Sequence, residues 1–124
     1  MKNNKVIVLG SSGFILKNLK NFFIKKKVNS TFISSKTIDL VKQNSYKKLS
    51  KKINTGNVVI FISAKAPVKN LEMLSDNIKI LENVSKAINK KKIKQIIYIS
   101  SDAVYSDSFK KISENYNREP DNLH

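Results

Sequence analysis

A short apolar run near the start of the chain leads directly into two closely spaced glycines. Val6–Leu9 has the length and the branched side chains of a buried strand, and Gly10-Ser11-Ser12-Gly13 follows it. Apolar residues then recur with helical spacing, at Ile15, Leu19, Phe22 and Phe23. The glycines therefore lie on a strand-to-helix turn, where free backbone N–H groups and the positive end of the helix face one point. Such a turn suits an anion such as a phosphate; the alternative is an ordinary turn that uses glycine for its backbone freedom.

The rest of the chain alternates strand and helix patterns. The expected strands are Val6–Leu9, Val28–Ser34, Thr37–Leu40, Val58–Ile62 and Ile96–Ile99. The expected helices begin at Ile15, contain Tyr46, Leu49 and Ile53, and span Leu71–Asn89, the last with a buried stripe of Leu71, Leu74, Ile78, Leu81, Val84 and Ile88. This alternation predicts an α/β fold: a doubly wound, mainly parallel sheet of five strands in the order 3-2-1-4-5, with helices on both faces. Residues 1–106 form this domain, and residues 107–124 form a polar, irregular tail.

Composition limits the classes of partner. The chain has 124 residues and a formal net charge of +15, but only Arg118 of its 24 basic residues is an arginine. Base readout and phosphate clamping favour arginine, and runs such as Lys25–Lys27 suit solvated helix faces, so the sequence argues against nucleic acid. No apolar run approaches membrane-spanning length and no signal-peptide pattern opens the chain, so we expect a cytoplasmic protein without a membrane partner. There is no cysteine.

Small and polar residues follow three of the expected strands. In sheets that bind dinucleotides, the residue after the second strand meets the adenine ribose, and a carboxylate there selects NAD. This chain has Ser34, Ser35 and Lys36 instead, which suit the 2′-phosphate of NADP; the alternative is a plain turn with one more lysine. Ser63 and Ala64 leave room for a ligand at the end of a central strand, or they are a small-residue turn.

Four of these segments, in this order, resemble one family, the extended short-chain dehydrogenases/reductases of the NAD-dependent epimerase/dehydratase group. Gly10–Ile15 resembles the family's G-x-x-G-F-I-G turn, and Ile99–Tyr105 resembles its S-[ST]-x-x-V-Y signature after the fifth strand. Asp39-Leu40, Ser63-Ala64 and Asn77-Ile78 match the family's Asp-Leu pair, its small residues after strand four, and the Asn-Val of the next helix. The resemblance covers essentially the whole chain, and the stretch Ser101–Tyr105 is closest to the branch of 4-keto-sugar-nucleotide reductases.

The resemblance implies a Rossmann-like nucleotide-binding domain, a dinucleotide partner and a set of site residues. The implied cofactor-binding residues are Gly10, Ser11, Ser12, Gly13, Phe14, Ile15, Ser35, Lys36, Asp39, Leu40, Ser63, Ala64, Asn77 and Ser100. The implied catalytic residues are Ser101, whose hydroxyl binds the substrate oxygen that is or becomes a carbonyl, and Asp102. The implied reaction is hydride transfer at a ketone or alcohol carbon of a nucleotide-linked or similar sugar. We expect NADP(H) rather than NAD(H) and no bound metal.

Two departures limit this expectation. Leu16 stands where the family has a third glycine, and no Tyr-x-x-x-Lys follows Ser101, because Tyr116 is followed by Pro120 at the lysine position and His124 stands where tyrosine would fall. We therefore expect the NAD(P)-binding half of such an enzyme, truncated before the substrate lobe and inactive as a fragment, and the sequence leaves open whether this chain is an enzyme. One alternative is a non-catalytic dinucleotide-binding module, and another is a basic protein that binds nucleic acid or other anions.

Overall fold

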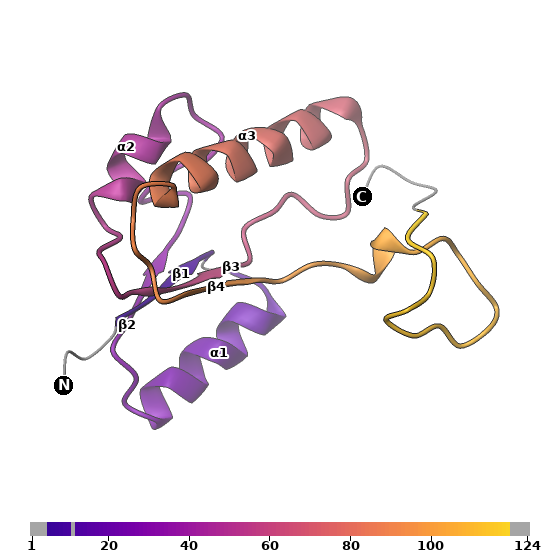
Figure 1. Ribbon diagram of the computed structural model, residues 1–124, viewed down its shortest axis with the longest axis horizontal. Helices are drawn as coiled ribbons and strands as arrows, with labels where there is room; N and C mark the ends of the chain where they lie inside the picture. Colours follow the sequence, from indigo (N-terminus) through magenta and orange to yellow (C-terminus); the bar gives the residue numbers. More distant parts are fainter. Residues whose placement is uncertain (1–4, 11, 120–124) are drawn as a thin grey trace.

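Four parallel strands form one sheet at the centre of the molecule, and helices cover both of its faces (Figure 1). The computed structural model describes residues 5–10 and 12–119. The strands are β1 (Val6–Leu9), β2 (Ser30–Ile33), β3 (Val58–Phe61) and β4 (Gln95–Tyr98), in the order β2-β1-β3-β4. Every neighbouring pair is parallel, and Val8 of β1 aligns with Phe32 of β2 and Ile60 of β3. The predicted Rossmann-like α/β fold is confirmed.

The sheet separates the core into two layers, one on each face. Helix α1 (Phe14–Lys25) covers one face, where Leu16 and Phe23 pack with Val8 and Ile60. Helices α2 (Ser45–Ser50) and α3 (Leu71–Ile88) cover the other face. The larger core lies there, and its fully buried members are Ile7, Leu9, Leu49, Ile53, Val59, Val84 and Ala87. Because successive side chains of a strand point to opposite faces, β1 and β3 need apolar residues at almost every position, as their sequences have.

The prediction of a third strand at Thr37–Leu40 is wrong. Thr37–Leu40 belongs to a turn, in which the N–H groups of Thr37 and Ile38 both donate to the carbonyl of Ser34, at 3.0 and 2.9 Å. Ile38 and Leu40 are nevertheless 5% and 6% exposed, because the turn inserts both side chains into the core. The apolar alternation that indicated a strand therefore reflects two buried side chains on a turn. The order of the other four strands agrees with the prediction.

Helix α3 lies where the sequence predicted it, but its buried face differs from the predicted one. Leu71, Ile78 and Leu81 of the predicted stripe are more than half exposed. The residues that α3 buries are Asp76, Ile80, Asn83, Val84 and Ala87. The helix thus turns the flank beside the predicted stripe toward the sheet and α2. The exposed apolar flank lies near β4, whose four residues are all exposed at the edge of the sheet.

After β4 the chain leaves the sheet. A 3₁₀ turn at Asp102–Val104 is the last regular element of the described chain, and residues 107–119 form no helix or strand (Figure 1). Within the described ranges, no helix has both the length and the apolar character needed to cross a bilayer.

Candidate functional site

The segments that follow β1, β2 and β3 meet around a cavity of about 310 Å³ at the carboxyl edge of the sheet. This is the edge at which open α/β sheets bind ligands. Backbone hydrogen bonds join the three segments, since Gly10 donates to the carbonyl of Ile33 at 2.9 Å and Ser63 donates to the carbonyl of Leu9 at 3.0 Å. The polar residues on the cavity wall are Ser12, Ser34, Ser35, Asp39, Ser63 and Lys65. The fold therefore brings together groups that lie far apart in the sequence.

Gly10 is required by a close approach between β1 and α1. Its φ of +131° is strained for other residues, and a Cβ built on it would lie 2.8 Å from Cδ1 of Leu16 and 3.6 Å from the Ser63 hydroxyl. Leu16, which replaces the family's third glycine, is 6% exposed and packs against Gly10 from the first turn of α1. A methyl group at position 10 would therefore force the Leu16 side chain to shift, whereas its distance from the Ser63 hydroxyl is an ordinary van der Waals contact.

Gly13 lies at the start of α1 and faces open space. It is the N-cap residue, with φ +97° and ψ 168°, and no side-chain hydrogen bond caps the helix there. A Cβ placed on Gly13 would meet no atom within 4 Å. Within the described helix α1 the first turn carries no acidic residue. The free N–H groups of this turn can therefore donate to an anion that enters the space beside Gly13.

A buried amide holds the loop that carries Asp39. The Oδ1 of Asp39 accepts from the N–H of Val41 at 3.1 Å, which fixes the carboxylate at the cavity wall. Asn83 of α3, 7% exposed, donates to the carbonyls of Leu40 and Lys42 at 2.9 and 3.2 Å and accepts from the N–H of Tyr46 at 3.2 Å. Asn83 was not predicted from the sequence; the available signal was an amide beside Val84 within a long helix.

Asn77 supports the wall of the cavity through the backbone. Its side chain accepts from the N–H of Lys65 at 2.7 Å and donates to the carbonyl of Lys65 at 3.0 Å. The ammonium of Lys65 also pairs with Asp76, whose side chain is 8% exposed, and Lys79 bonds the other oxygen of Asp76 at 3.2 Å. The hydrogen bonds from Lys65 and Lys79 lower the pKa of Asp76, and the bond to Asp76 raises the pKa of Lys65. Asn77 and Asp76 together anchor the loop that follows β3.

A second cavity, of about 390 Å³, continues from the first and shares Ser63 and Ala64 with it. Its wall includes Ser100 and Ser101, which follow β4. The hydroxyl of Ser101 accepts from the N–H of Ala103 at 3.2 Å and donates to Oδ1 of Asp102 at 3.2 Å, so it caps the 3₁₀ turn. The two cavities together form an elongated site across the ends of β1, β3 and β4.

Most of the predicted site residues lie along these two cavities. The first cavity includes Gly10, Ser12, Ser35, Asp39, Leu40, Ser63 and Ala64. The second includes Ile15, Asn77, Ser100 and Ser101. Gly13 and Phe14 line a third pocket, which shares Ser12 and Leu16 with the first cavity, whereas Lys36 and Asp102 are exposed and line none of the three.

Three positions named from the sequence, Ser11, Pro120 and His124, lie outside the described residues. Sequence reasoning missed Ile33, Ile38 and Lys65 on the first cavity wall. Lys65 directly follows the predicted Ser63-Ala64 pair, and this position in the sequence was the available sign that it lies at the site. Among residues 5–10 and 12–119 no three histidine or acidic side chains are grouped to hold a metal ion.

Comparisons with known proteins agree with this fold. Residues 6–123 match the model of the NAD dependent epimerase/dehydratase family. A GDP-L-fucose synthetase from Naegleria fowleri bound to NADP superposes with a TM-score of 0.76 at 20% identity, over 91% of this chain and 35% of that one. No curated protein sequence matches the chain.

Two epimerases of known structure are also similar. The ADP-L-glycero-D-manno-heptose-6-epimerase of Helicobacter pylori gives a TM-score of 0.74 at 19% identity, over 98% of this chain and 47% of that one. The UDP-glucuronic acid 4-epimerase of Bacillus cereus in complex with NAD gives 0.67 at 18% identity, over 96% of this chain and 47% of that one. This chain therefore spans less than half the length of these similar structures.

Proposed function

This chain belongs to the NAD-dependent epimerase/dehydratase family, and we propose that its elongated site binds a nicotinamide dinucleotide with the diphosphate at the Gly10–Phe14 turn. The observation that carries the proposal is the open space beside Gly13, at the uncapped start of α1. A Cβ would enter that space, so glycine keeps it free for a ligand, and the N–H groups of the helix start donate into it. Ser11 of the same turn is part of the proposed site.

The first cavity suits the adenosine end of the cofactor. Asp39 keeps one carboxylate oxygen on the Val41 N–H, and its other oxygen accepts from the adenine amino group. Ser35 and Lys36 follow β2, where the ribose 2′ position lies in this fold. Two features, a hydroxyl and an ammonium in place of a carboxylate, support NADP(H) over NAD(H). The similar solved structures include one bound to NADP and one with NAD.

The second cavity suits the nicotinamide end and the substrate. The bound cofactor supplies hydride transfer. Ser100 and Ser101 border the cavity from the end of β4, and the Ser101 hydroxyl, held by Asp102 and the Ala103 N–H, reorients to donate to a substrate oxygen. The names of the similar structures describe GDP-, ADP- and UDP-linked sugars, which supports a sugar nucleotide as the substrate class of a cytoplasmic oxidoreductase or epimerase.

The 124-residue sequence has no Tyr-x-x-x-Lys after Ser101. We expect the chain as it stands to bind the dinucleotide without turnover, because the proton transfer that accompanies hydride transfer has no positioned tyrosine. A non-catalytic dinucleotide-binding module is the alternative that the same observation favours. Turnover of a sugar nucleotide by this chain alone would exclude both the inactive half of an enzyme and the non-catalytic module.

Thermal unfolding with added dinucleotide tests the proposal. A ligand at about a hundred times its dissociation constant adds about 2.7 kcal/mol to stability, which raises the melting temperature of a domain of this size by on the order of ten degrees. Gly13→Ala should remove this shift, because the methyl group fills the diphosphate space. The matched control is Gly56→Ala, which places the same methyl group at another positive φ, +81°, in the turn before β3.

Two results would count against dinucleotide binding at this turn. One is an unchanged melting temperature of the native chain with saturating NADPH and with NADH. The other is an equal ligand shift in Gly13→Ala and Gly56→Ala.

A further inference from the structure

We propose that the end of the sheet opposite the dinucleotide site docks on an anionic lipid bilayer. This inference does not rest on the proposed function. It rests on nine lysines, here called the lysine end, that precede the four strands: Lys5, Lys25, Lys26, Lys27, Lys51, Lys52, Lys90, Lys91 and Lys92.

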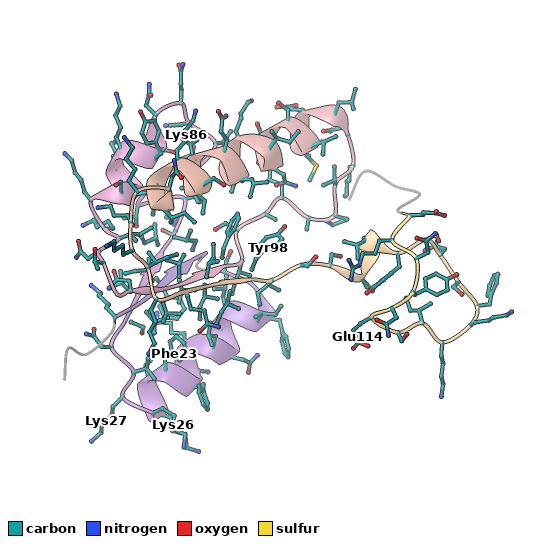
Figure 2. All side chains as sticks on the ribbon, in the orientation of Figure 1. Phe23, Lys26, Lys27, Lys86, Tyr98 and Glu114 are labelled. Atoms are coloured by element: carbon teal, nitrogen blue, oxygen red, sulfur yellow. The ribbon has the colours of Figure 1, made fainter. Side chains whose placement is uncertain are left out.

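The topology of the fold gathers these lysines from four separate segments. In a parallel α/β sheet every helix-to-strand connection returns to the end where the strands begin. Lys5 precedes β1, Lys25–Lys27 join α1 to β2, Lys51 and Lys52 lead from α2 toward β3, and Lys90–Lys92 join α3 to β4. Figure 2 shows Lys26 and Lys27 at the end of α1, at the opposite end of the molecule from Glu114 in the tail.

Backbone hydrogen bonds place three of these segments side by side. The carbonyl of Lys5 accepts from Val58 at 3.1 Å, and the carbonyl of Lys92 accepts from Gly56 at 2.9 Å. Since neighbouring strands lie about 4.8 Å apart, the four connections spread their charges over a face about 14 Å wide. Seven of the nine lysines are exposed, and Lys5 and Lys91 are half-buried. The lysine end is therefore a broad positive face.

No acidic residue in the connecting segments offsets the positive charge of this face. The segments 26–29, 51–57 and 89–94 contain no aspartate or glutamate. The three described ion pairs engage Lys65, Lys79 and Lys86, which lie on α3 or the loop before it. One or two lysines at a helix C-terminus complement the helix dipole. The runs Lys25–Lys27 and Lys90–Lys92 contain more lysines than this effect requires.

Exposed apolar side chains adjoin the lysines. Phe22 and Ile24, in the last turns of α1, are 53% and 68% exposed. Their carbonyls accept from the N–H groups of Lys26 and Lys27, so the backbone positions that carry the apolar and the charged residues are neighbours. Stable adsorption to a bilayer combines these two features, because lysines attract anionic headgroups and apolar side chains insert among the acyl chains. A bilayer contact of this kind needs no membrane-spanning segment, so the proposal replaces the expectation, drawn from the lack of such a segment, that the protein has no membrane partner.

Nucleic acid fits the same face less well. The lysine end contains no arginine, and arginine supplies the bidentate contacts typical of phosphate and base recognition. A lysine ammonium acts as a compact point charge, which suffices for a fluid anionic surface.

Two variants of equal charge test the proposal. The end variant is Lys26→Gln, Lys51→Gln and Lys92→Gln, and the control is Lys69→Gln, Lys110→Gln and Lys111→Gln, which are exposed lysines beyond the carboxyl edge of the sheet. Each lowers the net charge of +15 by three. Binding is measured by sedimentation with phosphatidylcholine vesicles that contain or lack phosphatidylserine, and circular dichroism checks folding. Each lysine near an anionic surface strengthens binding about fivefold, so the end variant should bind about a hundredfold more weakly.

The control variant should lose less than about fivefold, the effect of one lysine at the surface. Ile24→Ser, which keeps every charge, should weaken vesicle binding and leave binding to duplex RNA unchanged. Equal losses in the two lysine variants would overturn the proposal, because total charge would then explain adsorption. RNA binding that requires the lysine end, with no vesicle binding by the native chain, would also overturn it and assign the face to nucleic acid.

Discussion

The contact between Gly10 and Leu16 predicts how much stability the chain loses when a side chain is added at position 10, in the turn that carries the site. An alanine Cβ at position 10 would lie 2.8 Å from Cδ1 of Leu16, closer than real side chains pack. Leu16 cannot swing into solvent without loss, because it is 6% exposed in the core formed with Val8, Phe23 and Ile60. Gly10→Ala should therefore combine backbone strain with overpacking.

The magnitude follows from these two effects. A non-glycine residue at positive φ costs about 1–3 kcal/mol, and overpacking a core costs about 1–3 kcal/mol, so Gly10→Ala should lower the free energy of unfolding by about 2–6 kcal/mol. Gly13→Ala has the strain without the clash, since its Cβ would meet nothing within 4 Å, and should cost about 1–3 kcal/mol. The difference between the free energies of unfolding lost in Gly10→Ala and in Gly13→Ala isolates the effect of the contact with Leu16.

A double-mutant cycle measures that contact directly. Leu16→Ala alone should cost about 2–5 kcal/mol as a core truncation. In Gly10→Ala/Leu16→Ala the new methyl group meets no leucine, so the double variant should be about 1–3 kcal/mol more stable than the sum of the single effects. Urea unfolding, followed by far-ultraviolet circular dichroism, gives the four free energies. Additivity within about 0.5 kcal/mol would refute the proposed packing of α1 on the turn.

Three further predictions concern residues in and around the site. Lys36→Glu should raise the dissociation constant of NADPH by about tenfold or more, since hydrogen bonds to charged groups are worth about 1.5–3 kcal/mol, and should leave that of NADH nearly unchanged; equal changes measured by calorimetry would remove the preference for NADP. Asp76→Asn should destabilise the chain at neutral pH, because the lowered pKa of Asp76 contributes stability above its unfolded value of about 3.9 that is lost as the pH falls through the folded pKa. Melting temperatures of native chain and variant should therefore converge in acid, and a constant difference down to low pH would contradict the Lys65–Asp76 pairing. Asn83→Ala should cost about 1–3 kcal/mol in urea unfolding, because Tyr46 and the Leu40 and Lys42 carbonyls lose their partner, and a cost below about 0.5 kcal/mol would show that water replaces the amide.

The sequence was sufficient for the elements whose burial dictates every residue. β1 and β3 are enclosed by helices on both faces, so their apolar runs are unambiguous, and the glycines after β1 mark the turn to α1. Thr37–Leu40 was misread because two buried side chains at alternate positions look the same on a short strand and on a turn. Only the distribution of backbone hydrogen bonds, which the sequence does not encode locally, separates the two.

The buried face of α3 depends on what packs beside it. Its apolar residues cover more than one face, so periodicity alone does not fix which side meets the sheet; the structure turns Ile80, Val84 and Ala87 inward. The same rotation buries Asn83 and brings Asn77 onto the backbone of Lys65. Motif resemblance placed Asn77 at the site, but its two-point bond to Lys65 and the role of Asn83 appear only in the folded chain.

The central claim is that backbone N–H groups at the start of α1 bind the diphosphate of a dinucleotide. Amide chemical shifts of the isotope-labelled chain, followed by NMR during titration with NADPH, test it most directly. The largest shifts should fall on the amides of Ser12, Gly13, Phe14 and Ile15, with smaller ones at Ser63 and Ala64. Saturable binding that leaves the amides of residues 12–15 unshifted would contradict it.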